Sequence, residues 1–222
     1  MTMGSQGFPR PDSEADGQLK FLIIGAGSRG NAYAQALLRS TPDANIGAVA
    51  EPVAFKRLAF GRKYVWKHDY IPTTDQSFVD WEEFANYEAE RRRKRDHGEH
   101  VKSGVDGIFV CTLDETHAEI ITSLAPLGIS IMSEKPLATR LTDCLKIYRS
   151  LLPAATPHPP PVFSIGHVLH YSPHNMLLHS LLREEEVIGD ILSFEHTEPV
   201  GWWHFSHAYV RSACTNNDRC QS

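Results

Sequence analysis

The sequence predicts an α/β fold in which a doubly wound parallel sheet is followed by a partial α+β C-terminal domain. Three observations support the parallel sheet. Strand-length apolar runs alternate with helix-length segments from residue 19 to about residue 153, the strand runs are almost wholly apolar, and the first run leads into a glycine-rich loop. Strands that helices bury on both faces have this composition, whereas half-exposed strands alternate polar and apolar residues.

The predicted elements follow in order along the chain. The apolar runs that predict strands are LKFLIIG (19–25), NIGAVAE (45–51), GIFVC (107–111) and ISIMSE (129–134), with a weaker one in HDYIPTT (68–74). The residue pattern predicts helices at 31–40, 54–64, 77–98, 114–128 and 141–153, the last with Thr139 as its N-cap. The basic run RRRKR (91–95) is flanked by acids, which predicts a solvated helix face or loop.

Shifts in composition predict the domain boundaries. Residues 1–18 are polar and are interpreted as a disordered lead-in, and residues 19–154 form the parallel-sheet domain. The proline-rich stretch 155–161 is interpreted as a linker. Residues 162–211 start a second, incomplete domain with a strand at 162–169, an amphipathic helix at 172–187 and a strand at 190–200, and residues 212–222 are an unpatterned tail.

The composition argues against several classes of protein. The chain has 222 residues and a formal net charge of −5, which disfavours nucleic acid as a partner. No apolar stretch approaches the ~20 residues that span a bilayer, so no membrane partner is expected. The four cysteines, Cys111, Cys144, Cys214 and Cys220, have neither metal-ligand nor disulfide-framework spacing, and a reducing cytoplasmic location is expected.

The loop GAGSRG places three glycines in a GxGxxG arrangement between a strand and a helix. Gly25 allows the tight turn, Gly27 lets a pyrophosphate approach the backbone, and Gly30 lets the helix pack on the strand. Ser28 and Arg29 lie at the helix start, where free N–H groups and the helix dipole favour anions. This context predicts a dinucleotide-binding Rossmann domain, with a glycine-rich turn that binds nothing as the alternative.

An acid at the end of the second strand supports the dinucleotide interpretation. Glu51 ends NIGAVAE, at the distance from the loop where Rossmann domains carry the residue that accepts hydrogen bonds from a ribose diol. Its charge would repel a 2′-phosphate, so NAD is the expected cofactor. Lys56 and Arg57 follow closely and leave NADP open, and an ordinary acid at a strand end is the alternative for Glu51.

Two further stretches carry a family resemblance. Residues 105–138, which end in the strand IMSEKPLA, resemble the second half of the Rossmann domain in the glucose–fructose oxidoreductase, inositol dehydrogenase and rhizopine catabolism (Gfo/Idh/MocA) family. Residues 166–204 resemble that family's entry into its C-terminal substrate domain. The resemblance covers most of residues 19–211 and implies a nicotinamide-dependent oxidoreductase that acts on a sugar, cyclitol or similar polyol.

The resemblance also assigns roles around the Glu-Lys-Pro strand end. Lys135 would be the catalytic lysine, which hydrogen-bonds the reacting oxygen and stabilises its developing negative charge. Glu134 would orient Lys135 through a charge-assisted contact, and Pro136 would fix the turn. Ligands bind beyond the carboxyl ends of strands in such sheets, which agrees with this placement.

Other candidate residues lie on neighbouring segments. Thr112 would line the cofactor cleft, whereas His117 would either contact the cofactor region or start a helix. His170, Tyr171 and His204 are the candidate substrate-binding residues. A metal site built from His204 and neighbouring histidines lacks an acidic or cysteine ligand at suitable spacing, so no metal is expected.

The sequence departs from the family pattern in two places. His170 stands where an arginine is common, and no Asp/His motif with a proton-shuttling histidine follows residue 211. We therefore expect a C-terminally truncated chain with impaired hydride transfer. The alternatives are a non-catalytic dinucleotide-binding regulatory protein and an inactive fragment, and a homo-oligomer of the full-length form stays open.

Overall fold

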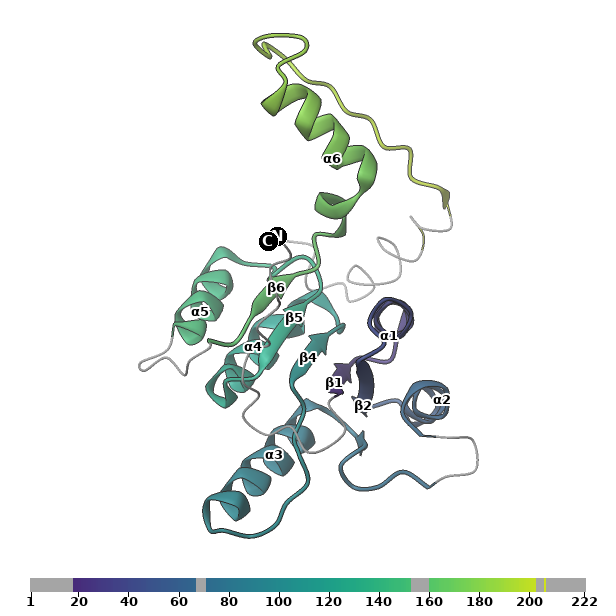
Figure 1. The fold of residues 1–222 in the computed structure, drawn as a ribbon, viewed down its shortest axis with the longest axis vertical. Helices are drawn as coiled ribbons and strands as arrows, with labels where there is room; N and C mark the ends of the chain where they lie inside the picture. The colour runs from purple at the N-terminus through teal and green to yellow at the C-terminus, as the bar shows by residue number, and fades with distance from the viewer. Residues whose placement is uncertain (1–17, 67–70, 153–159, 203–205, 207–222) are drawn as a thin grey trace, which may run out of the picture. The chain divides into compact units, whose positions relative to one another are not determined.

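A parallel sheet lies at the centre of the first part of the chain (Figure 1). The computed structural model describes residues 18–66, 71–152, 160–202 and 206. Six strands follow the order β3-β2-β1-β4-β5-β6, and every neighbouring pair is parallel, which confirms the predicted α/β class. Their bounds are β1 Leu19–Ile24, β2 Ala44–Ala50, β3 Ser77–Phe78, β4 Gly107–Val110, β5 Ser130–Ser133 and β6 Phe163–Ile165.

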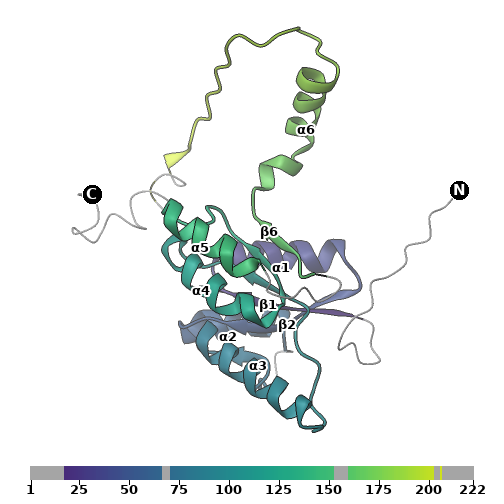
Figure 2. The same ribbon diagram turned by 90° about the vertical axis from the view of Figure 1, so that its left-hand side faces the viewer.

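Helices cover both faces of this sheet (Figures 1 and 2). Their bounds are α1 Ser28–Ser40, α2 Ala54–Tyr64, α3 Trp81–Asp96, α4 His117–Leu124 and α5 Leu141–Leu151, with short 3-10 turns at Asp114–Thr116 and Ala125–Leu127. Helices α1 and α2 pack on one face, and α3, α4 and α5 pack on the other. The doubly wound arrangement explains why the strands are apolar on both sides.

Successive residues of β1 supply the two faces of the core. Leu22 and Ile24 join the cluster that contains Ile120 and Ile121 of α4. Ile23, which points the opposite way, joins the cluster that contains Phe60 of α2. Full burial of one such side chain stabilises the fold by about 2 kcal/mol.

Three predictions about where elements begin are corrected by the structure. Residues 71–74 of the weak predicted strand form no strand, and the edge strand is instead Ser77–Phe78, at the head of the predicted helix. Helix α3 begins at Trp81 because Asp80 caps it, accepting a 2.8 Å hydrogen bond from the Glu83 N–H. The predicted cap Thr139 is wrong: Arg140 is the N-cap of α5, and no side chain caps that helix.

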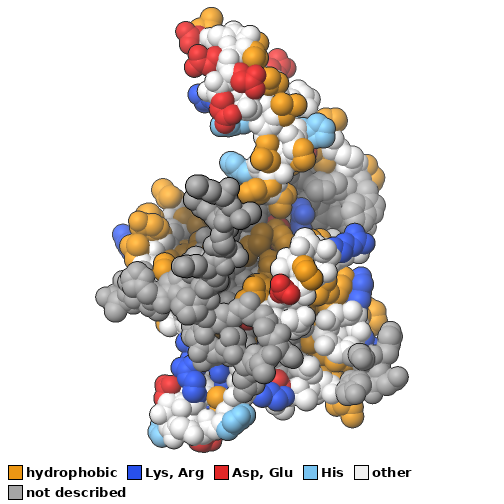
Figure 3. Space-filling view, viewed as in Figure 1, with side chains coloured by type: hydrophobic (Ala, Val, Ile, Leu, Met, Phe, Trp, Pro, Cys, Tyr) orange, Lys and Arg blue, Asp and Glu red, His pale blue; other side chains and the backbone are white. Residues whose placement is uncertain are grey.

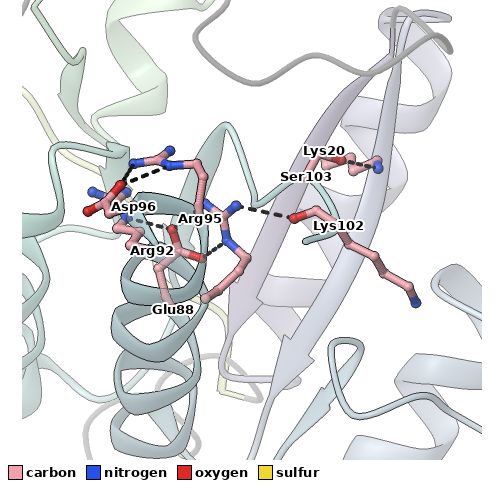
Figure 4. Close-up of polar contacts among 8 residues, drawn as sticks. Lys20, Glu88, Arg92, Arg95, Asp96, Lys102 and Ser103 are labelled. Atoms are coloured by element: carbon pink, nitrogen blue, oxygen red, sulfur yellow. Dashed lines mark hydrogen bonds and ion pairs between the residues drawn. The ribbon is translucent and has the colours of Figure 1, made fainter. Parts of the chain in front are cut away.

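The basic run on α3 is only partly solvated. Glu88 is buried and accepts hydrogen bonds from Arg91 Nε at 2.7 Å, Arg91 Nη2 at 2.8 Å and Arg92 Nε at 2.7 Å. Arg91, also buried, donates to the Lys102 carbonyl at 3.2 Å and so ties α3 to the segment before β4. Figure 4 shows Glu88 with its partner Arg92, and Lys102 on that segment. Burial alone raises the pKa of Glu88, but the hydrogen bonds and positive charges of the two arginines outweigh it and hold that pKa below its ordinary value.

The chain divides into two units after Val168. Strand β6 pairs with β5, so the predicted strand at 162–169 belongs, in its shorter form, to the sheet of the first unit. The predicted linker therefore precedes the last strand of that sheet, and its residues 155–159 lie outside the described part. The predicted second domain at 162–211 stays a prediction.

The second unit begins with helical structure. A 3-10 turn spans Val168–Tyr171, and α6 (Pro173–His179) continues into a π-helical turn at Ser180–Glu184, in agreement with the predicted amphipathic helix. Many of its hydrophobic side chains are exposed, as the surface over α6 shows (Figure 3). The predicted strand at 190–200 is wrong: these residues form no strand, since a strand needs a neighbour with which to pair.

Candidate functional site

The glycine turn after β1 depends on close backbone packing. Gly25 has a φ of +95°, and a Cβ there would lie 2.6 Å from the Cys111 carbonyl oxygen. A Cβ on Gly30 would lie 2.1 Å from the Gly25 carbonyl oxygen. A Cβ on Gly27, in contrast, would meet nothing within 4 Å. The outer two glycines therefore serve the fold, whereas the space over Gly27 is open to a ligand, as a pyrophosphate requires.

The start of α1 has the properties of an anion site. Ser28 and Arg29 are exposed in its first turn, and no side chain caps this helix. Its first N–H groups thus lack intrahelical partners, and the helix dipole adds partial positive charge. Asn31, which the sequence analysis missed, stabilises the turn by donating from Nδ2 to the Ala26 carbonyl at 3.1 Å and the Gly27 carbonyl at 2.9 Å. An asparagine four residues after the second glycine was the available signal.

Glu51 is joined directly to the glycine turn. Its carboxylate is buried and accepts hydrogen bonds from the Ala26 N–H at 2.8 Å and the Val53 N–H at 3.0 Å. Arg57 donates to the Glu51 carbonyl. The carboxylate is therefore held in one orientation at the end of β2, with lone pairs that the two N–H groups leave available for ribose hydroxyls.

Lys135 and Glu134 follow the end of β5. Lys135 is exposed, and the peptide bond to Pro136 is cis. Glu134 is buried, and its Oε2 accepts a 3.0 Å hydrogen bond from the backbone N–H of Lys135. The sequence predicts a contact between Glu134 and the Lys135 ammonium. The structure shows instead that the Glu134 carboxylate accepts from the backbone N–H of Lys135.

The second carboxylate oxygen of Glu134 faces α1. It accepts a 2.7 Å hydrogen bond from the Tyr33 hydroxyl and lies 3.8 Å from Arg29 Nε. Burial raises the pKa of Tyr33, and the hydrogen bond to Glu134 with the charge of that carboxylate raises it further. The hydroxyl therefore stays protonated and remains a donor. Tyr33 was not predicted from the sequence, although it follows Gly30 by three residues and shares its helix face.

His117 joins two strand ends. It is the first residue of α4 and fully buried, and its Nδ1 donates to the Pro136 carbonyl at 2.8 Å. Its Nε2 lies 3.3 Å from the carbonyl oxygen of Thr112, whose hydroxyl accepts from Thr116 at 2.8 Å. The sequence suggests that His117 either contacts the cofactor region or starts a helix, and the structure places it at the start of α4. The ring also connects the end of β4 to the lysine turn, and it faces the interior.

Cys111 lies beside this region. It follows β4, and its carbonyl packs against Gly25. Burial raises the pKa of its thiol to about 12, and the negative charge of Glu134 adds to the increase. The thiol is therefore a weak nucleophile at neutral pH.

Of the predicted substrate-binding residues of the second unit, His170 and Tyr171 are exposed. His170 and Tyr171 lie in the 3-10 turn, and His204 lies outside the described residues. A pocket of about 450 Å³ within this unit is lined by Leu169, His170, Asn175, Met176, His179 and Glu184. Across the described ranges, no group of three or more His, Cys, Asp or Glu side chains could hold a metal ion.

Comparison with known proteins identifies the family. The model of the Gfo/Idh/MocA oxidoreductase family, described as having an NAD-binding Rossmann fold, matches residues 19–152. The chain belongs to this family. The resemblance carried by GxGxxG and Glu-Lys-Pro is thus confirmed, and residues 19–152 of this Gfo/Idh/MocA protein form an NAD-binding domain.

Solved structures of other proteins share the fold. Scyllo-inositol dehydrogenase from Lactobacillus casei has a TM-score of 0.60 and 18% identity, and the match covers 80% of this chain and 44% of that one. Myo-inositol 2-dehydrogenase from Lactobacillus plantarum has a TM-score of 0.60 and 16% identity, covering 78% of this chain and 43% of that one. At these identities the likeness establishes the fold alone.

One curated relative is similar in sequence. The 2,7-anhydro-N-acetylneuraminate hydratase of Mediterraneibacter gnavus is 27% identical over 101 residues, which cover 46% of this chain and 25% of the relative. The Gfo/Idh/MocA chain therefore spans less than half the length of the proteins that it matches. No helix in the described ranges is both long and apolar enough to cross a membrane.

Proposed function

We propose that the chain is an NAD-dependent oxidoreductase that transfers hydride between nicotinamide and a carbinol carbon of a sugar or cyclitol-like polyol. One observation carries the proposal: the Glu51 carboxylate accepts a 2.8 Å hydrogen bond from the Ala26 N–H, beside the open space over Gly27. A ribose acceptor and a pyrophosphate cradle thus adjoin at the carboxyl ends of the strands, where Lys135 also lies.

The residues present fit a dinucleotide. The N–H groups of Gly27, Ser28 and Arg29 would hold the pyrophosphate, because the helix that they open has no side-chain cap. Glu51 would accept hydrogen bonds from the ribose diol. Thr112, half-buried after β4, would line the cleft, and His117 would support that strand end from within.

The lysine turn would serve the substrate. The exposed Lys135 ammonium would donate to the reacting oxygen and stabilise the negative charge that develops there. Bound NAD would supply the hydride acceptor. His170, Tyr171 and His204 are proposed to bind the substrate, and a polyol is favoured because two inositol dehydrogenases share the fold. The cytosol stays the proposed compartment on the grounds of cysteine spacing.

Glu51 favours NAD over NADP in this proposal. The Glu51 carboxylate would lie against a 2′-phosphate, and removal of one like-charge repulsion is worth roughly tenfold in affinity. Arg57 donates to the Glu51 backbone carbonyl, so its guanidinium is engaged next to this position. Because Arg57 is engaged in this way, it is less able to offset the repulsion between Glu51 and a 2′-phosphate. We therefore expect NADP to bind more weakly than NAD.

Isothermal titration of NAD and NADP tests the proposal. The unsubstituted chain should bind NAD more tightly than NADP, and Glu51→Gln should reduce this preference by roughly tenfold. The matched control is Glu82→Gln, an exposed acid in the first turn of α3 on the other face of the sheet. Absence of binding of either dinucleotide at millimolar concentration would refute the proposal.

Turnover distinguishes the enzyme from a regulatory protein. The impaired hydride transfer expected from the sequence predicts slow formation of NADH, followed at 340 nm, from scyllo-inositol or myo-inositol. Lys135→Met should abolish this signal while NAD still binds. Dinucleotide binding without turnover of any polyol would instead favour a non-catalytic dinucleotide-binding protein.

A further inference from the structure

The Glu134 carboxylate lies where three segments of the first unit meet. It follows β5, the Tyr33 side chain reaches it from α1, and Gly166 approaches it from the end of β6. Only 6% of Glu134 is exposed. A buried carboxylate requires several donors to offset its desolvation, so the donors that face Glu134 determine its position.

Tyr33 is the donor that connects this carboxylate to the glycine turn. Its hydroxyl lies 2.7 Å from Glu134 Oε1, and its ring packs against Phe109 of β4 with centroids 5.5 Å apart. Arg29, one helical turn earlier, lies 3.8 Å from the same oxygen but has a side chain that is 53% exposed. The partly buried Tyr33 therefore makes the shorter and more sheltered contact.

Gly166 covers the hydroxyl and the carboxylate. A Cβ at this position would lie 2.5 Å from the Tyr33 hydroxyl oxygen and 3.3 Å from Glu134 Oε1. The Gly166 N–H donates to the Ser133 carbonyl at 2.7 Å, which fixes this approach. The backbone of Gly166 thus comes close enough to exclude water from the Tyr33–Glu134 bond, and low local dielectric strengthens it.

We propose that Tyr33 is a positioning residue for Lys135, an inference that rests on the proposed function of Lys135. The Tyr33 hydroxyl holds Oε1 of Glu134, and Oε2 of the same carboxylate holds the Lys135 N–H at 3.0 Å. One rigid carboxylate therefore links α1, whose first turn faces the proposed pyrophosphate site, to the backbone that presents the lysine.

Amide hydrogen exchange of Lys135, measured by NMR on the full chain without ligand, tests the link. Tyr33→Phe keeps the ring on Phe109 and removes only the hydroxyl. Glu134 then loses the hydroxyl that donates to its Oε1, and the Lys135 amide should exchange roughly tenfold faster. Tyr87→Phe is the matched control, because this tyrosine ring packs on Phe78 beyond the other face of the sheet.

The outcomes separate clearly. An unchanged Lys135 exchange rate in Tyr33→Phe, or an equal acceleration in Tyr87→Phe, would overturn the inference. If Tyr33→Phe does not fold, Gly166→Ala replaces it, because a Cβ 2.5 Å from the Tyr33 hydroxyl oxygen would displace that hydroxyl from Glu134 and should also accelerate exchange. Failure of the unsubstituted chain to bind NAD would overturn the proposed function, whereas the exchange rates decide the role of Tyr33 without any ligand.

With turnover established, kinetics supply a second readout. Loss of lysine positioning should lower kcat several-fold in Tyr33→Phe while the Kd for NAD changes by less than about twofold. A change confined to NAD affinity would contradict a role that acts through Lys135.

Discussion

Replacing Gly30 by alanine places a methyl group against the glycine turn. The new Cβ would lie 2.1 Å from the Gly25 carbonyl oxygen and 3.0 Å from Ile23 Cγ2. The nearest obstacle is backbone, and the Gly25 that carries it is itself packed on Cys111. The Gly25 backbone cannot shift without disturbing its packing on Cys111, so the start of α1 must move away from the end of β1.

The size of the effect follows from two opposing terms. Forcing an extra methyl into a packed site costs typically 1–3 kcal/mol, and the rigid backbone obstacle favours the upper end, about 3 kcal/mol. Alanine is a better helix former than glycine, which offsets about 1 kcal/mol. The net destabilisation is therefore about 2 kcal/mol, which corresponds to a decrease in Tm of roughly 4–8 °C.

Gly27→Ala is the matched control in the same loop. Its Cβ would meet nothing within 4 Å and its φ is −77°, so the unfolding free energy should change by less than about 1 kcal/mol. The methyl would instead occupy the open space over the turn and weaken NAD binding. Urea unfolding and NAD titration of both variants test this contrast, and a Gly30→Ala chain as stable as Gly27→Ala would refute the packing argument.

Two further predictions concern ionisation. Because the Glu88 pKa is lowered in the folded chain, its stabilising contribution is present above the ordinary pKa of about 4.3 and is lost as the pH falls through the folded value. Glu88→Gln leaves the buried Arg91 without its carboxylate and should lower the free energy of unfolding by about 3 kcal/mol at pH 7, as measured by urea unfolding. A destabilisation that does not shrink below pH 4 would contradict this reasoning. Because the Cys111 pKa is raised to about 12, its thiolate fraction at pH 8 is roughly 1,000-fold below that of an ordinary thiol. Mass spectrometry should therefore find Cys144 alkylated by iodoacetamide well before Cys111. Equal rates of alkylation would count against burial as the cause of the raised pKa.

The sheet and the edge that carries the candidate site could be predicted from sequence. Apolar strands joined by helices specify a parallel sheet, and such a sheet brings its carboxyl ends together. The glycine turn, Glu51 and Lys135 each end or follow one of these strands, so their common edge follows from the topology. The bond between Glu51 and Ala26 is a direct result of that arrangement.

The partners within the site could not be predicted in the same way. Tyr33 and Glu134 are 101 positions apart in the chain, and periodicity places each on an element without saying which side chains meet. Strand β3 has only two residues and is defined by pairing with β2, not by its own apolar pattern. The strand predicted at 190–200 has suitable residues but pairs with no strand in the described part of the chain, which shows the same dependence on tertiary context.

The position of β6 determines what an isolated dinucleotide-binding domain must contain. This strand follows the proline-rich stretch, yet it completes the sheet by pairing Ile131 with Phe163 and Ser133 with Ile165. A chain break between α5 and β6 would therefore divide one folding unit. The N-terminal piece would lack β6 and Gly166, and water could then reach the Tyr33–Glu134 hydrogen bond. A boundary drawn after residue 168 keeps the strand and its glycine with the nucleotide fold.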